Sequence, residues 1–246
     1  MISHKLNPGS ASGPPQSHAD SHRLGGADVI DPKPLIGEAM ASAISAYSMI
    51  GYGWLAYGTA TDVSSARDAS ADGIGFKQSS AASAATGGVY NWPLAAVFDT
   101  AWLPKVRVKV KLDTVATVRY FFGLSSDTGA NTVADDDPAT YQCGIQFSTA
   151  RGDTNWQLAL DDNGTQVLTD TGLAAAAGVY WFEVDITAAG SCKFTIQDGA
   201  GTELYSATIS ANVPSAGAGM YFVHGGETQA AVAINPITYK VQAYSP

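Results

Sequence analysis

Hydrophobic and polar residues alternate with a period of two over most of the chain beyond about residue 52. Residues 105–112 show this most clearly, because Val106, Val108, Val110 and Leu112 are separated by basic residues. Successive side chains of a strand point to opposite faces, so the pattern predicts a strand with one buried and one solvent-facing side. Clear strands are predicted at 105–112, 117–124, 141–149, 155–161, 180–187, 192–198, 203–209, 219–224 and 237–244, and weaker ones at 53–58, 73–78 and 89–99.

Turn-forming residues separate these segments, as in Asp162-Asn163-Gly164 and Asp198-Gly199. Many short strands without helices between them are typical of an all-β, antiparallel two-sheet sandwich. We therefore predict that residues 52–246 form one jelly-roll sandwich.

Residues 1–34 lack this pattern and contain few large hydrophobic side chains. Such a segment cannot offset its own ordering entropy, so we predict an extended N-terminal arm. Residues 35–51 carry a narrow hydrophobic stripe at helical spacing, which predicts a short amphipathic helix or a linker. The prolines of the arm are Pro8, Pro14, Pro15, Pro32 and Pro34.

The composition argues against several functional classes. The net charge is −9, and an acidic surface repels the phosphate backbone of nucleic acids. No apolar run reaches the roughly 20 residues that a membrane helix needs, and the N-terminus does not resemble a secretory signal. Hence we expect no nucleic-acid partner, no membrane insertion and synthesis in a cytoplasm.

Cys143 and Cys192 both fall on the apolar side of predicted strands, and we interpret them as small buried hydrophobes, with a bridge between them as the alternative.

Four consecutive parts of the body resemble the central strands of concanavalin-like or laminin-G-like jelly rolls. In that group, an aromatic-rich strand precedes one with the pattern x-Phe-x-Ile-x-Asp-Gly and then a hairpin. The resemblance covers roughly residues 55–245 and supports the predicted fold. The matching parts are QLALD at 157–161, VYWFEVDI at 179–186, KFTIQDG at 193–199 and TELY at 202–205.

The arm contains the sequence SHADSHRLGGAD at residues 17–28. The pattern His-x3-His-x2-Gly-Gly-x-Asp is similar to a short motif of structural proteins of tailed bacteriophages, where it lies in N-terminal segments of head-decoration, fibre and minor tail proteins. This resemblance implies a virion component that binds a neighbouring protein through its arm. The residues predicted to make that contact are His18, Asp20, His22, Gly25, Gly26 and Asp28.

A metal site is the alternative interpretation of the arm. His18 and His22 are four residues apart, and Asp20 or Asp28 would supply a third ligand. The prolines and glycines around them disfavour the helix that this spacing requires, so we interpret the imidazoles as hydrogen-bonding groups and leave the metal unassigned.

The body offers other candidate sites. The acidic run Asp135-Asp136-Asp137 suits Ca²⁺, although such runs are usually solvated loops. The tripeptide at 151–153 matches an adhesion motif, but a match of three residues is expected by chance and a tight turn between strands explains it fully. Asp161-Asp162-Asn163-Gly164 is interpreted as a hairpin rather than a site.

Lys105, Arg107, Lys109 and Lys111 form a basic row in an acidic protein. The row is either a solvated sheet face or a contact for an acidic neighbour or an acidic glycan, and the solvent-side Trp181 could stack on a sugar ring.

Little in the sequence indicates catalysis. The motifs of serine hydrolases, zinc proteases and phosphate-binding loops are missing. His224 is the histidine on which a triad in the body would depend. Glu183 and Asp185 lie two apart on one strand, a spacing seen in some sandwich-fold glycosidases. Such glycosidase sites usually lie among more aromatic and acidic residues than this strand offers. We therefore predict a protein that is not an enzyme and has no cofactor.

Together these observations predict a structural protein of a phage virion, assembled in the host cytoplasm. A capsid decoration or head-fibre protein is preferred, with the arm bound to the major capsid protein or to a neighbouring structural protein. A homotrimer is expected by analogy with other projecting phage proteins. The alternative is a tail-fibre or baseplate protein that binds a host surface glycan.

Overall fold

The computed structural model describes residues 54–57, 64–70, 73–79, 88–93, 98–127, 132–133, 135–138, 140–215 and 217–244. The predicted arm at 1–34 and the helix or linker at 35–51 lie outside these residues, so both stay predictions. Within the described part of the chain, no helix is long and apolar enough to cross a membrane.

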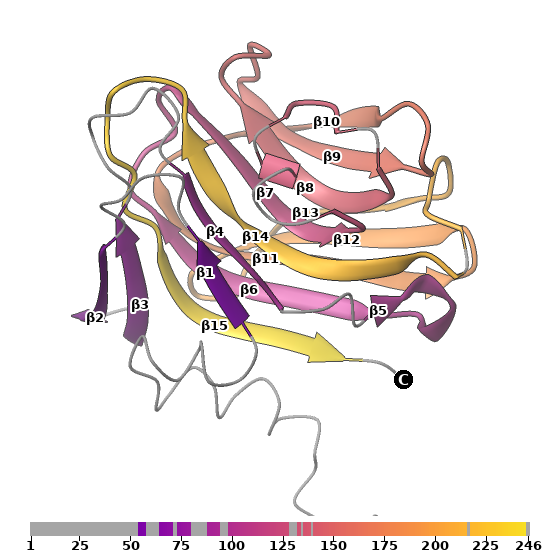
Figure 1. Cartoon of the computed structure of the whole chain (residues 1–246), viewed down its shortest axis with the longest axis horizontal. Helices are drawn as coiled ribbons and strands as arrows, with labels where there is room; N and C mark the ends of the chain where they lie inside the picture. The colour runs from indigo at the N-terminus through magenta and orange to yellow at the C-terminus, as the bar shows by residue number, and fades with distance from the viewer. Residues whose placement is uncertain are drawn as a thin grey trace, which may run out of the picture.

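The strands form two antiparallel sheets that pack face to face (Figure 1). The first sheet has eight strands in the order β1-β4-β14-β7-β8-β9-β10, with β5 beside β14. Its strands are β1 (Trp54–Tyr57), β4 (Gly88–Pro93), β5 (Phe98–Asp99), β7 (Val118–Ser125), β8 (Gln142–Ser148), β9 (Asn155–Asp161), β10 (Val167–Ala174) and β14 (Gly219–Thr228).

The second sheet has seven strands in the order β13-β12-β11-β6-β15-β3-β2. A short 3-10 helix at Thr100–Trp102 leads into its strand β6. The strands are β2 (Ser64–Ser70), β3 (Gly73–Ser79), β6 (Lys105–Leu112), β11 (Gly178–Ala188), β12 (Ser191–Asp198), β13 (Glu203–Ile209) and β15 (Ile237–Tyr244). The predicted all-β, antiparallel two-sheet architecture is confirmed.

The core consists of the inward-facing side chains of both sheets. Phe122 of β7 stacks on Phe182 of β11 with 4.3 Å between ring centroids, and Trp156 of β9 meets Phe182 edge-on at 4.9 Å. These three side chains are at most 2% exposed. Aromatic pairs of this kind contribute about 0.5–1.5 kcal/mol beyond the burial of their surface, so they help to fix how one sheet sits on the other.

Two strands were missed by the sequence pattern, and β14 extends well beyond its predicted end. β2 and β10 lack the expected alternation of large hydrophobic side chains, and each lies at the edge of its sheet. The prediction ended the strand at His224, but β14 continues through two glycines to Thr228. Gly226 permits this because the ring of Tyr120 occupies the space of a Cβ atom there.

The N-terminal strands pair with the C-terminal ones. β4 pairs with β14 in the first sheet, and β3 pairs with β15 in the second. Among the described strands, β1 pairs with β4 alone and β2 with β3 alone. As a result β14 and β15 lie inside their sheets, although they are the last strands along the described chain (Figure 1).

Candidate functional site: a basic face on the second sheet

The outer face of the second sheet concentrates the basic side chains of the protein. The alternation in β6 buries its valines and Leu112, and it directs Lys105, Arg107, Lys109 and Lys111 outward. Strand register places three more lysines on this face, because directly opposed residues share a face. Lys193 lies opposite Asp185, Lys240 opposite Lys109, and Lys77 opposite Ile237, which itself faces Lys111.

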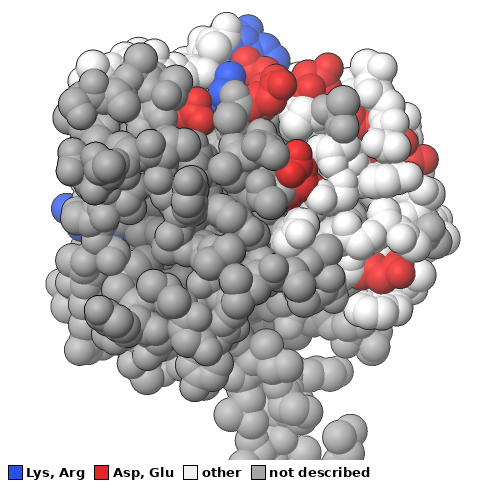
Figure 2. Space-filling view, viewed as in Figure 1, with Lys and Arg blue, Asp and Glu red and all other residues white. Residues whose placement is uncertain are grey.

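We call this surface the basic face. Of the 13 lysines and arginines in the chain, seven of those with described side chains lie on it. The described carboxylates on it are Glu183, Asp185 and Glu203, so positive groups exceed negative ones by four. The view in Figure 2 shows the opposite balance, with Asp and Glu spread over the described surface and small areas of Lys and Arg near its edge. A local field of opposite sign to the net charge of −9 favours an acidic partner.

Two carboxylates on β11 are held by the basic row. Lys105 Nζ lies 2.8 Å from Glu183 Oε1 and 3.4 Å from Asp185 Oδ2, and Arg107 Nε lies 3.7 Å from Glu183 Oε2. Burial alone would lower the pKa of Lys105, but the hydrogen bond and charge of Glu183, together with Asp185, raise it above its usual value. The lysine therefore stays charged, and both carboxylates take part in ion pairs across the sheet.

Trp181 is held flat against a cation. The guanidinium carbon of Arg107 lies 3.9 Å from the centroid of the Trp181 ring. Nη2 of the same arginine donates a 2.6 Å hydrogen bond to Gln197 Oε1 on β12. The guanidinium is thus fixed by the Trp181 ring, by Gln197 and by the carboxylate of Glu183, so it would lose little further freedom on contact with another group.

A second cation lies near an aromatic ring on the same face. Lys109 Nζ is 5.6 Å from the centroid of the Tyr239 ring. A bulge in β15 between Thr238 and Lys240 places Tyr239 over Gly75, where its Cδ1 lies 2.7 Å from the position of a Cβ atom. Thus the predicted residues Lys105, Arg107, Lys109, Lys111 and Trp181 lie together on one surface that combines cations with aromatic rings.

The outer face of the first sheet carries a polar network that the sequence did not reveal. Arg119 Nε donates to Asp136 Oδ1 at 2.7 Å, and Nη1 donates to the carbonyl of Val133 at 3.3 Å and lies 3.7 Å from Glu227 Oε1. Arg119 and Glu227 are only 8% and 6% exposed. Nearby, Gln146 Oε1 accepts a hydrogen bond from Arg151 Nη1 at 3.2 Å. The segment around Asp136 packs over the polar positions of these strands, and the alternation along the sequence does not show this contact.

The acidic run at 135–137 contributes to this network. Burial would raise the pKa of Asp136, but the hydrogen bonds and charges of Arg119 and its neighbours lower it below the usual value. Asp135 Oδ1 accepts from the backbone of Asp137, and Asp137 Oδ1 accepts from the backbone of Gln166. Among the described residues, no three His, Cys, Asp or Glu side chains are grouped as metal ligands, and the three aspartates contact different partners.

Two other sequence candidates form turns. Arg151 Nε donates to Asp153 Oδ1 at 3.0 Å, so the Arg-Gly-Asp tripeptide is closed on itself by an ion pair. Asp161 Oδ1 accepts from the backbone of Gly164 at 2.6 Å, and Asn163 has a φ of 58°. The prediction of a hairpin at 161–164 is confirmed. Burial raises the pKa of Asp161 above its usual value.

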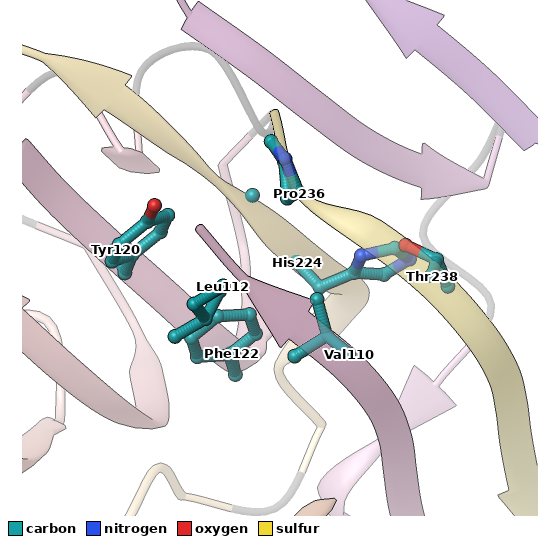
Figure 3. Close-up of a pocket in the computed structure, with 8 residues that line it drawn as sticks. Val110, Leu112, Tyr120, Phe122, His224, Pro236 and Thr238 are labelled. Atoms are coloured by element: carbon teal, nitrogen blue, oxygen red, sulfur yellow. The ribbon is translucent and has the colours of Figure 1, made fainter. Parts of the chain in front are cut away.

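His224 faces an internal cavity rather than the surface (Figure 3). The cavity has a volume of about 10 Å³, which is room for at most one water molecule. Complete burial lowers the pKa of His224 to about 3, so the imidazole is neutral at pH 7. The residues that line the cavity are Val110, Leu112, Tyr120, Phe122, His224, Gly225, Pro236 and Thr238.

The arm residues His18, Asp20, His22, Gly25, Gly26 and Asp28 lie outside the described residues. Their predicted contact with a virion partner stays a prediction.

Comparison with known proteins identifies relatives of the fold. The protein of unknown function SO2946 from Shewanella oneidensis MR-1 superposes with a TM-score of 0.54 at 15% identity, over 77% of this chain and 79% of that one. The carbohydrate esterase vb_24B_21 from the Shiga toxin-encoding bacteriophage phi24B gives 0.52 at 13% identity, over 83% and 95% of the two chains. The exoplasmic/lumenal domain of VIP36 in its Ca²⁺/Man-bound form gives 0.51 at 10% identity, over 85% and 91%.

The superpositions establish a shared fold. The identities of 15% or less leave the activity open. No curated protein matches the sequence. The family model described as the SO2946-like, C-terminal domain matches residues 72–239, which is more than half of the chain and spans most of both sheets. The protein therefore belongs to the SO2946-like C-terminal domain family.

Proposed function

We propose that the protein is a non-enzymatic structural component of a tailed-bacteriophage virion, assembled in the host cytoplasm. In this proposal residues 1–34 bind the major capsid protein or a neighbouring structural protein, and the sandwich is displayed as a capsid decoration or head fibre. The observation that carries the proposal is the segment SHADSHRLGGAD at 17–28, which precedes a compact β-sandwich. Phages do encode this fold, since the phi24B carbohydrate esterase shares it.

The sandwich itself supports a structural role. Glu183 and Asp185, the carboxylates with glycosidase-like spacing, contact Lys105 and Arg107 in ion pairs. His224 is neutral and enclosed in the core. The two carboxylates are thus engaged in ion pairs between β11 and β6, which is what a structural role of this sheet would require.

Deletion of residues 1–34 tests the anchoring role. The remaining body should fold, because its core draws on residues from 106 onward, and it should fail to join the particle. Incorporation is measured by mass spectrometry of purified particles assembled with the truncated or the full-length chain. Normal incorporation of the truncated chain would refute anchoring by the arm. Light scattering on the full-length chain tests the expected trimer, in which three arms raise avidity without new contacts.

A second candidate function is binding of an acidic host glycan by a tail-fibre or baseplate protein. The observation that favours it is the Arg107–Trp181 pair on the basic face, which offers a fixed cation beside an aromatic ring. A glycan array on the full-length chain should then show binding to uronate or sulfate sugars that Trp181→Ala abolishes. Trp102→Ala is the matched control, since Trp102 is 56% exposed and lies outside the basic face. Equal loss in both variants, or no binding, would reject this function.

Enzymatic activity is tested separately. Incubation of phage-host polysaccharide with the wild type and with Glu183→Gln should give no cleavage in either case. Cleavage that depends on Glu183 would replace the structural proposal with a glycoside hydrolase.

A further inference from the structure

Two cysteines from opposite sheets meet in the centre of the core. Cys143 lies on β8 of the first sheet and Cys192 on β12 of the second, and both are 0% exposed. Their Sγ atoms are 2.6 Å apart. This separation is closer to the roughly 2.05 Å of a disulfide bond than to the roughly 3.5–4.0 Å at which non-bonded carbon atoms pack.

The strand ladders hold both cysteines in place. Cys143 is opposite Leu124 on one side and Leu160 on the other. Cys192 is opposite Ile186 and Ile209 in the same way. Each cysteine therefore lies on an interior strand whose backbone is paired on both edges. The two sulfur atoms meet because the sheets pack, and no loop has to move to bring them together.

We propose that Cys143 and Cys192 are a modification site, at which an intramolecular disulfide joins the two sheets through the core. Formation of the bond oxidises both thiols. A low-molecular-weight disulfide, such as oxidised glutathione, takes up two electrons and two protons and leaves as two thiols. First one cysteine thiolate attacks this disulfide and forms a mixed disulfide, and the second cysteine then displaces the remaining small thiol.

Burial sets when the bond can form. Desolvation, together with the neighbouring thiol, raises the pKa of Cys192 well above its usual value, so the closed sandwich holds a protonated and inaccessible thiol. Thiols in this form react slowly, because the thiolate is the nucleophile. The disulfide forms while the sheets assemble, or during a large opening of the sandwich. In a reducing cytoplasm both cysteines stay reduced, and refolding under oxidising conditions joins them.

The experiment uses the full-length chain, unfolded with reductant and refolded in buffers with an excess of either reduced or oxidised glutathione. Samples are quenched with acid, denatured, alkylated with N-ethylmaleimide and weighed intact. We expect two adducts after reducing refolding. After oxidising refolding we expect a monomer without adducts that is lighter than the reduced chain by two hydrogen atoms. Cys143→Ala and Cys192→Ala should each carry one adduct under reducing conditions.

Thermal unfolding provides a second measurement. The bond closes a loop across a sequence separation of 49 residues, and the reduction in unfolded-chain entropy corresponds to a rise in Tm of roughly 10 °C. This difference between oxidised and reduced protein should vanish in Cys143→Ala. Two adducts on the wild type after oxidising refolding, a glutathione adduct in place of the internal bond, or a disulfide between chains would each overturn the proposal. The wild-type mass decides the matter even if a variant fails to fold.

Discussion

Replacement of Arg119 by methionine should destabilise the sandwich strongly. The Arg119 side chain is 10% exposed, and it lies 2.7 Å from a carboxylate oxygen of Asp136 and 3.7 Å from one of Glu227. Methionine occupies much of the same volume but removes the charge, so Glu227 stays buried without its cation. Breaking a buried pair costs about 3–5 kcal/mol. Asp136 is 27% exposed and regains water, so we expect the lower end, about 3 kcal/mol.

Urea unfolding followed by tryptophan fluorescence measures this loss, which corresponds to a fall in Tm of roughly 9 °C. Lys193→Met is the matched control, since Lys193 is a half-exposed cation on the outer face of the other sheet, and its replacement should change stability by less than about 0.5 kcal/mol. Adding Glu227→Gln to Arg119→Met should recover part of the loss, because it removes the buried negative charge.

The pH dependence provides an independent check. The pKa of Asp136 is lowered in the folded protein, so its contribution is present above the unfolded pKa and is lost as pH falls through the folded pKa. Arg119→Met should therefore reduce the loss of stability below about pH 4. If Arg119→Met lowers the free energy of unfolding by less than about 1 kcal/mol at pH 7, and leaves the loss of stability at low pH unchanged, the network of Arg119 contributes little.

Three further substitutions test the interior. His224 has a folded pKa of about 3, below its unfolded value, so stability should fall as pH drops from about 6.5, by roughly 3 kcal/mol at pH 4. His224→Gln should flatten this slope in urea titrations, and an equally steep slope would contradict the burial of a neutral imidazole. Gly123→Ala should lower the free energy of unfolding by about 2 kcal/mol or more, because the new Cβ would meet the carbonyl oxygen of Cys143 and Cα of Gly144. An unchanged Tm would indicate that the strands separate easily at this point. Phe182→Ala should cost about 3–5 kcal/mol by calorimetry, since it removes a ring that packs on Phe122 and Trp156, and a smaller loss would mean that the core collapses into the vacated space.

Much of the fold could be predicted from the sequence because alternation records which side of a strand is buried. The bounds of β6, β9, β13 and β15 agree with the prediction. β2 has the sequence SSARDAS, which contains no large hydrophobic side chain, so its pairing with β3 left no trace in the hydrophobic pattern. β10 is interrupted by a register shift and by Gly172 with a φ of 68°, which break the periodicity.

Of the candidate site, only the row of basic residues on β6 could be predicted from the sequence. The alternation in β6 was sufficient to place Lys105, Arg107, Lys109 and Lys111 on one face. Strand order was not predictable, and it is strand order that brings Gln197 and Trp181 against Arg107. For the same reason the network around Arg119 could not be predicted, because its partners lie 17 and 108 positions away along the chain.

The position of β14 and β15 inside their sheets has a consequence for synthesis of the protein. Because translation proceeds from the N-terminus, β1 to β4 leave the ribosome long before the strands that pair with them. Until β14 and β15 emerge, β4 and β3 each have one unpaired edge, and neither the β1–β4 pair nor the β2–β3 pair is joined to the rest of its sheet. A nonsense codon before Ile237 would thus remove one strand directly and detach two others, β2 and β3, from the product. Quality-control proteases would then meet exposed strand edges at both ends of a truncated chain.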